Sequence, residues 1–426
     1  MRIMIIFSLL FCFVPFSSGY NISDTPEGWA SMNDGTTGGI GGEELTVSTS
    51  EEFIGAATST NKKIILVKKG NYSVGRLLVQ SNKSILGLEP GIVVDGTIAI
   101  RDNVHNVIIR NIAFINSQKC NSYKACQSGP DAMNIMYGAH NVWLDHLDIS
   151  DGQDGNLDVT RASDFITVTW CKFSYSYPKP HAFSNLIAGS GGETESRGKL
   201  KITYAFCWWA DNIVQRQPYG RFGKIHLLNC LWTSQRTKDA ACCSREMQML
   251  VEHGVFNCSG VGFRPDGGDF KLIGNIGTNK QITGNKGVVF TPPYKPLSQR
   301  MDASEVEAKV KAEAGNNMTL NRNTIVYNDN VSKRAALQPY VANRASGLML
   351  HNPTASKLTF TVVTLDGQTA VPTTHIPGGK SVKLPPVAAS MLLISFKGAH
   401  ATTNGYLLNV HGSFSKRIRS SGLSLE

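Results

Sequence analysis

Short apolar strand patterns, rather than helical ones, dominate the middle of the chain. β-Branched and aromatic residues gather in runs that end near Asn, Asp or Gly, as strands commonly do. These runs are 106–114, 141–146, 165–173, 201–209 and 224–232. Their spacing is irregular, which fits a repeating unit of a little over twenty residues joined by loops of different lengths. Such a repeat is typical of a parallel β-solenoid, in which each coil stacks on the previous one.

The pattern changes in the last third of the chain. Ser304 and Glu307 form a capping box, which predicts a helix that ends near Gly315. Beyond it, alternating strands separated by Gly- and Pro-containing turns predict a small β-sandwich-like module over residues 321–412. The Ser- and Arg-rich stretch 413–426 is predicted to be a disordered tail. We therefore expect an all-β protein, with a solenoid domain over residues 20–320.

The first residues have the pattern of a secretory signal peptide. A short basic start is followed by the apolar run 3–16 and by small residues at 17–19. This run is short for a membrane span, which disfavours an uncleaved anchor, and no later run is long enough. Residues 1–19 are therefore predicted to be a cleaved signal peptide. We expect a secreted, extracellular protein that does not associate with a membrane.

Export makes disulfide bonds plausible among the cysteines that follow the leader, because extracellular compartments are oxidising. These eight cysteines are Cys120, Cys126, Cys171, Cys207, Cys230, Cys242, Cys243 and Cys258. Cys120 and Cys126 flank a short loop and are the favoured pair. Cys171, Cys207 and Cys230 occupy equivalent places in three strand runs, so they would stack in a solenoid. A Cys207–Cys230 bond and a row of buried thiols are equally compatible with that stacking.

The charge balance indicates a polyanionic partner. Lys and Arg total 42 against 32 for Asp and Glu, a formal net charge of +10. The chain has no RNA-binding signature and no dense basic tract, so we expect no nucleic-acid partner. For an exported protein, an acidic polysaccharide is the favoured partner. Asn-x-Ser/Thr sequons that would accept glycans are at Asn21, Asn71, Asn82, Asn257, Asn317 and Asn330.

Three aspartates and two arginines in the solenoid region carry the most specific chemistry. Asp131, Asp154 and Asp158 supply carboxylate oxygens, which are the preferred ligands of Ca²⁺. Arg216 and Arg221 supply fixed cations that bind carboxylates in a forked geometry. Alone, Asp154 and Asp158 would be typical of turn caps. Together, the five residues predict a site that holds an acidic polymer between a metal ion and a guanidinium group.

The ordered series of motifs resembles the family of extracellular pectate and pectin lyases, which are built on a right-handed parallel β-helix. The similarity spans about residues 28–315 and includes the Gly-rich segment 28–42, the run 141–146 and the segment 216–226. It implies a polysaccharide lyase of the pectate lyase type. Such an enzyme cleaves (1→4)-α-D-galacturonan, the acidic polymer of pectin, by Ca²⁺-dependent β-elimination to unsaturated oligogalacturonides. We expect it to act as a monomer.

The resemblance also implies roles for individual residues. The three aspartates resemble the calcium ligands of the family. Arg216 resembles the base that removes the C5 proton, and Arg221 resembles the arginine that binds a substrate carboxylate. The family places a further basic residue shortly before the Leu-Ile segment. Lys179 is the nearby candidate for that substrate-binding role, whereas Tyr219 stands where the family usually has another basic residue.

Two alternative functions remain open from the residues. A pectin lyase would act on methylated substrate without calcium, but the three retained aspartates argue against it. A catalytically impaired wall-binding solenoid is favoured by Tyr219 and opposed by the retained Arg216. Asp145 and His146 also resemble a site, yet we interpret them as a buried, hydrogen-bonded structural pair.

Overall fold

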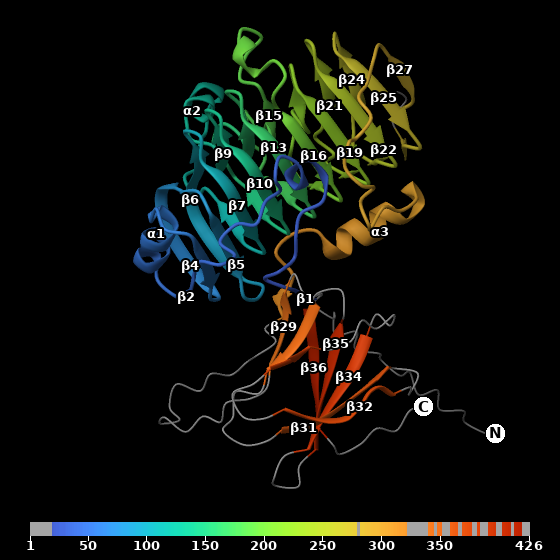
Figure 1. Ribbon diagram of the computed structural model, residues 1–426. Helices are drawn as coiled ribbons and strands as arrows, with labels where there is room; N and C mark the ends of the chain where they lie inside the picture. The colour runs from blue at the N-terminus through green and yellow to red at the C-terminus, as the bar shows by residue number, and fades with distance from the viewer. Residues whose placement is uncertain are drawn as a thin grey trace, which may run out of the picture. The chain divides into compact units, whose positions relative to one another are not determined.

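The computed structural model describes residues 19–278 and 282–321, together with the backbone of eight strands between residues 340 and 419 (Figure 1). The chain divides into two compact units, 1–321 and 322–426. The predicted signal peptide, apart from Gly19, lies outside the described residues. No helix among those residues has the length and apolar character that a membrane crossing needs.

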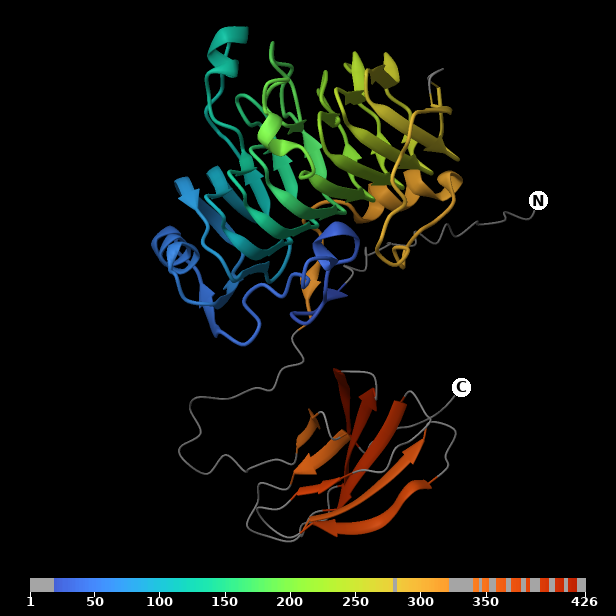
Figure 2. The same ribbon diagram turned by 45° about the horizontal axis from the view of Figure 1, so that its top comes forward.

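The first unit is a parallel β-helix, which confirms the predicted fold (Figures 1 and 2). Its larger sheet has fifteen strands and turns a corner at β6 (Ile92–Arg101), which pairs with β4 (Gly70–Leu78). On one side of the corner lie β9 (Met133–Met136), β12 (Leu157–Val159), β15 (Leu186–Ile187), β18 (Tyr219–Gly220), β21 (Asp239–Ser244) and β24 (Val261–Asp266). We call this side, with β4 and β6, the site face.

On the other side of the corner lie β8 (Ala113–Ile115), β11 (Asp148–Ser150), β14 (Lys172–Ser174), β17 (Trp208–Trp209), β20 (Leu231–Trp232), β23 (Val255–Phe256) and β26 (Ile276–Gly277). The other large sheet has eleven strands: β2 (Glu43–Val47), β3 (Lys63–Val67), β5 (Lys83–Gly87), β7 (His105–Arg110), β10 (His140–Asp145), β13 (Asp164–Thr169), β16 (Lys201–Ala205), β19 (Lys224–Leu228), β22 (Gln248–Glu252), β25 (Asp269–Ile273) and β27 (Gly284–Lys286). Only its last pair, β25–β27, is antiparallel among these described strands.

Aromatic side chains form a ladder along the interior of the solenoid. The rings of Phe173 and Trp209 are stacked 5.4 Å apart, Trp209 and Trp232 5.0 Å apart, and Trp232 and Phe256 4.0 Å apart. Because equivalent residues of successive parallel strands are about 4.8 Å apart, one ring per coil gives a continuous stack. Trp209 is therefore a core residue, while its neighbour Trp208 is half-buried.

Single left-handed residues make the sharp turns that leave the eleven-stranded sheet. They are Asn111, His146, Trp170, Phe206, Asn229 and His253, with φ between 49° and 58°. Asn tolerates this conformation, but bulky residues adopt it only when packing holds them there. Trp170 and Phe206 supply that packing for each other, because their rings stack 4.5 Å apart.

The cysteine predictions have different outcomes. Cys120 and Cys126 form the predicted disulfide, which joins the segment before α2 (Tyr123–Gln127) to Cys126 within that helix. The alternative of a Cys207–Cys230 bond is wrong, since both residues are free and buried. Parallel stacking points their side chains in the same direction rather than at each other. Each thiol instead donates to a backbone carbonyl, Cys207 to Ala205 O and Cys230 to Leu228 O.

Helices and the N-terminal segment cover the solenoid. α1 (Ser50–Thr58) places Phe53 in the core at the N-terminal end. α3 (Ala303–Glu313) confirms the predicted helix, although Asp302 is its N-cap and makes no side-chain cap. The Gly-rich segment, with the short helix η1 (Gly28–Ser31), packs closely on the eleven-stranded sheet. A Cβ on Gly39 would lie 1.8 Å from Lys63 O, so only glycine fits there. β1 (Gly19–Tyr20) pairs with β28 (Thr319–Leu320).

The second unit contains two antiparallel sheets, as a β-sandwich-like module requires. One sheet is β29 (Tyr340–Arg344), β30 (Gly347–His351) and β33 (Ser381–Lys383). The other is β32 (Thr369–Ile376), β31 (Leu358–Thr364), β34 (Met391–Lys397), β35 (Thr403–Asn409) and β36 (Ser413–Arg419). The predicted tail therefore begins too early, because 413–419 pairs with β35. Its polar composition concealed alternating Phe414 and Ile418, and residues 420–426 lie outside the described part.

A buried ion network ties the N-terminal segment to the solenoid and confirms the structural interpretation of Asp145 and His146. Asp145 lies 2.8 Å from Arg110 Nε and 2.9 Å from His146 Nδ1, and it accepts a hydrogen bond of 2.6 Å from Thr169 Oγ1. These partners hold the pKa of Asp145 below its usual range despite its burial. Arg110 also contacts Asp24 at 2.9 Å.

We predict that Asp145→Asn lowers the free energy of unfolding by about 3 kcal/mol, because the buried Arg110 guanidinium loses the buried one of its two charged partners, Asp145 and Asp24. Urea denaturation would measure the loss. The matched control is Asp102→Asn, which removes an exposed ion pair with Arg101 and should cost less than about 0.5 kcal/mol. Equal losses in the two variants would contradict the assigned role of the network.

Candidate active site

The candidate residues come from nearby coils of the solenoid and lie along the site face. Asp131 lies two residues before β9, Asp158 lies in β12 with Asp154 in the loop before it, and Arg216 precedes β18. β9 and β12 are adjacent strands in register, with Asn134 opposite Asp158. The fold therefore brings together two acidic segments more than twenty residues apart in sequence.

Gly155 forms a cradle between two of the carboxylates. A Cβ on this residue would lie 2.9 Å from Asp158 Oδ1 and 3.2 Å from Asp131 Oδ1. The two oxygens can therefore approach the same point because no side chain stands between them. Asp158 Oδ1 accepts a hydrogen bond from Leu186 N at 3.0 Å, whereas Asp131 Oδ1 is enclosed and has no hydrogen-bond partner.

The carboxylates are in an environment that disfavours their charge. Burial raises the pKa of Asp158 to about 7, and Arg216 and the Leu186 N–H only partly offset this effect. Burial also raises the pKa of Asp131 well above its usual range, and the charges of Asp158 and Asp154 add to the increase. Two enclosed, mutually repelling carboxylates would be stabilised by a bound cation.

These features fit a hard divalent cation on three counts: an orphaned oxygen, a glycine cradle and an all-oxygen donor set. Among the described residues, no group of three acidic, His or Cys side chains is already gathered to hold a metal. Asp154 instead contacts a histidine, since its Oδ1 lies 2.7 Å from Nε2 of the fully buried His181. Asp131 and Asp158 are therefore better placed than Asp154 to hold a cation.

Arg216 is half-buried and adjacent to the acidic residues. It adopts a left-handed backbone conformation (φ 60°), and its guanidinium lies 4.7 Å from the centre of the Phe183 ring. Its charge lowers the pKa values of Asp131 and Asp158, which places it within electrostatic reach of both. The predicted base and the predicted metal ligands therefore share one surface.

Arg221 lies just beyond the other end of β18. Its guanidinium donates a hydrogen bond of 2.8 Å to Ala188 O and packs 4.4 Å from the centre of the Tyr219 ring. Tyr219 thus supports Arg221 from the position where a basic residue was expected. The face of the Tyr219 ring also lies 5.6 Å from the Arg264 guanidinium.

Lys179 does not lie as a substrate-binding lysine would. It is 1% exposed, and its ammonium donates hydrogen bonds to Gly152 O and, at 2.7 Å, to Gln153 O. Burial lowers its pKa to about 8, opposed by the charges of Asp151, Asp154 and Asp131. Its ammonium therefore anchors the backbone of the loop that carries Asp154. The sequence placed Lys179 near the site but could not give its direction.

An aromatic cluster beside the site was not predicted from the sequence. His181 packs 4.1 Å from Phe183 and 4.8 Å, edge to face, from Tyr123, which lies on α2 inside the disulfide loop. His181 in turn contacts Asp154. The only available signal was the position of His181 shortly before the Leu-Ile segment, which has no spacing rule of its own.

The fold places the chain among proteins built on a parallel β-helix, and comparisons with known proteins identify the family. The family model for pectate lyase matches residues 16–319. Pectate lyase A of Emericella nidulans is 32% identical over 314 residues, which are 71% of this chain and 90% of the relative. The chain belongs to the pectate lyase family and is a polysaccharide lyase.

Two further similarities agree with this assignment. The pectate trisaccharide-lyase of Thermotoga maritima is 34% identical over 218 residues, covering 49% of this chain and 57% of the relative. The crystal structure of pectate lyase Bsp165PelA from Bacillus sp. N165, in complex with trigalacturonate, matches with a TM-score of 0.56 and 24% identity. The match covers 68% of this chain and 98% of that protein, and it supports the fold.

We predict that Lys179→Met lowers the free energy of unfolding by about 2 kcal/mol, because the buried carbonyl of Gly152 and the partly buried carbonyl of Gln153 lose their hydrogen-bond donor. Urea denaturation would measure this loss. Lys199→Met, at an exposed lysine, is the control and should be close to neutral. An unchanged stability combined with weaker substrate binding would instead support the substrate-binding role expected from the sequence.

Proposed function

We propose that the protein is a secreted, calcium-dependent pectate lyase that acts as a monomer on polygalacturonate. The observation that carries the proposal is the meeting of Asp131, Asp158 and Arg216 on one surface of a pectate lyase fold. Family membership supports the type of reaction. The secretory leader predicted from the sequence supports the location, and the basic net charge supports an acidic polymer as substrate.

In the proposed reaction, Arg216 accepts the proton from C5 of a galacturonate unit. The C4–O bond to the next sugar then breaks, a C4=C5 double bond forms, and the released oxygen takes a proton from solvent. No water is added across the bond, so the products are unsaturated oligogalacturonides. An arginine can accept this proton only in its neutral form.

The other residues bind and orient the substrate. Arg221, held by Ala188 and the Tyr219 ring, binds the carboxylate next to C5. Asp131 and Asp158, with Asp154, would hold Ca²⁺, which supplies positive charge to the substrate carboxylate when it is bound. Lys179 positions the loop of Asp154 through its hydrogen bonds to Gly152 O and Gln153 O.

The alternative of a pectin lyase, which needs no calcium, is less well supported. Two carboxylates with raised pKa values and an orphaned oxygen are costly to keep together without a cation. A non-catalytic wall-binding protein would not need Arg216 beside them. These observations favour the calcium-dependent reaction.

We predict that Gly155→Ala weakens calcium binding at least tenfold, because the new Cβ displaces the oxygens of Asp131 and Asp158. In the wild type, Ca²⁺ at about 100 times its Kd should stabilise the fold by about 2.7 kcal/mol. Calorimetry would show this stabilisation reduced to about 1.4 kcal/mol or less in the variant, because the same Ca²⁺ concentration is then at most about ten times the Kd. Gly55→Ala is the control, because nothing lies within 4 Å of the added Cβ. The stabilisation by Ca²⁺ should be unchanged in this variant. If Ca²⁺ stabilised Gly155→Ala as much as the wild type, the ion would have to bind elsewhere.

We predict that Arg216→Lys retains binding of polygalacturonate but reduces turnover at least a hundredfold, the usual effect of removing a general base. Titration calorimetry would measure binding, and the ultraviolet absorbance of the unsaturated product would measure turnover. Arg236→Lys, at an exposed arginine outside the site, is the matched control. Turnover equal to the control would refute the base assignment.

A further inference from the structure

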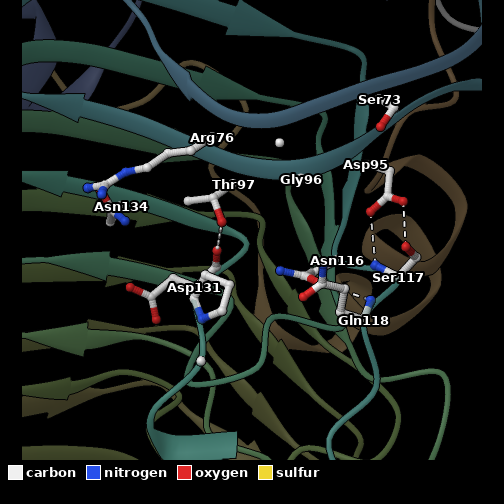
Figure 3. A pocket seen from close by; sticks show the side chains of 13 residues that line it. Ser73, Arg76, Asp95, Gly96, Thr97, Asn116, Ser117, Gln118, Asp131 and Asn134 are labelled. Atoms are coloured by element: carbon white, nitrogen blue, oxygen red, sulfur yellow. Dashed lines mark hydrogen bonds between the residues drawn. The ribbon is translucent and has the colours of Figure 1, made fainter.

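A hollow on the site face adjoins the acidic residues on the side away from Arg216. It has a volume of about 470 Å³, within the range of small-ligand sites, and its lining includes Arg76, Thr97, Asp131 and Asn134 (Figure 3). β4, which carries Arg76, is three strands from β12 in the sheet order, or about 14 Å. A polymer that crosses the aspartates toward Arg216 would therefore extend into this hollow in the other direction.

The backbone of two neighbouring strands makes room for a ligand. The register of β4 shifts between Ser73 and Gly75, a β-bulge opposite Gly96 of β6. Gly75 (φ 58°) and Gly96 (φ 139°) both adopt conformations that favour glycine. A Cβ on Gly96 would lie 2.4 Å from Gly75 O. This part of the lining is therefore bare backbone, which a bulky ligand can approach closely.

One side chain of the hollow has an unmet hydrogen-bonding requirement. Asn134 is 6% exposed, yet its Oδ1 has no hydrogen-bond partner. Buried amide oxygens in proteins are almost always paired, so the exception points to a missing donor such as a sugar hydroxyl. In the view of Figure 3, Asn134 lies with Arg76 and Asp131 on one side of the hollow.

Arg76 gives the hollow its charge preference. It is the one basic residue in the described lining, its side chain is exposed, and it forms no ion pair with any described residue. Asp95, on the opposite side, is already engaged, because it accepts hydrogen bonds from Ser117 N at 2.9 Å and Ser117 Oγ at 2.5 Å. A free guanidinium beside an unpaired amide oxygen suits a ligand that is both a carboxylate and a polyol.

We propose that this hollow is a uronate-binding subsite, in which Arg76 binds the carboxylate and Asn134 the hydroxyl groups of a galacturonate unit distant from the cleaved bond. The inference rests on the proposed function, because it assumes that the same polymer occupies the site of Arg216. The subsite makes affinity depend on chain length. Long galacturonate chains fill both places, whereas short chains fill only the reacting one.

The test is equilibrium binding of hexagalacturonate and trigalacturonate by titration calorimetry, in an Arg216→Lys background that prevents cleavage. Arg76→Gln should reduce the preference for the hexamer over the trimer about tenfold, the loss of one charge-assisted hydrogen bond. Lys62→Gln is the matched control, because it removes the same charge from an exposed lysine just before β3 of the eleven-stranded sheet. Its hexamer preference should stay within twofold of the parent.

An Arg76→Gln preference equal to that of Lys62→Gln would overturn the subsite and leave the proposed function intact. A fully methyl-esterified hexamer should bind equally well to Arg76→Gln and Lys62→Gln. If Arg76→Gln bound the esterified hexamer about tenfold more weakly than Lys62→Gln did, the carboxylate would not be the group that Arg76 binds. If the protein with native Arg216 formed no unsaturated product, the proposed function would fail. Binding that depends on Arg76 would still test the subsite independently of that result. If neither oligomer bound, both the subsite and the proposed function would be overturned.

Discussion

Parallel pairing between successive coils holds residues that are twenty or more positions apart in sequence about one strand spacing apart in space. Every part of the site depends on this constraint. It sets Asn134 beside Asp158 and Leu186 beside Tyr219, and so it aligns the segments that carry the aspartates with the segment that carries Arg216. A row of outward-facing side chains along the site face becomes a continuous surface for a linear polymer.

The same constraint forces like charges together. Asp131 and Asp158 share the cradle at Gly155, and their raised pKa values express the free-energy cost of keeping both ionised there. Regular packing in the rest of the solenoid stabilises the fold and offsets this free-energy cost. Aromatic ladders fill the interior, and the Arg110–Asp145 network fixes the N-terminal segment. Lys179, although cationic, is used inside the protein to hold the acidic loop in place.

Much of the fold was predictable from the sequence, because strand runs with inward β-branched and aromatic residues repeat at each coil. The acidic and basic segments were also recognisable, since their residue types limit the chemistry. The directions in which the side chains point were not predictable from the sequence. Lys179 and His181 are two residues apart, and no pattern shows that the first anchors a carbonyl while the second contacts Asp154. Cys207 and Cys230 illustrate the same limit, because stacking gave their proximity but not the orientation that prevents a bond. The segment 413–419 was misjudged because its composition hid a short alternating pattern.

The most direct test of the account is product formation from polygalacturonate by the purified protein, followed by the ultraviolet absorbance of the C4=C5 double bond. The reaction would be run with Ca²⁺, then with a chelator, and then with Ca²⁺ restored. The account predicts a rise in absorbance that stops with the chelator and resumes with the ion. A rise that is indifferent to the chelator would contradict the calcium role of the aspartates, and no rise under any condition would contradict the lyase function itself.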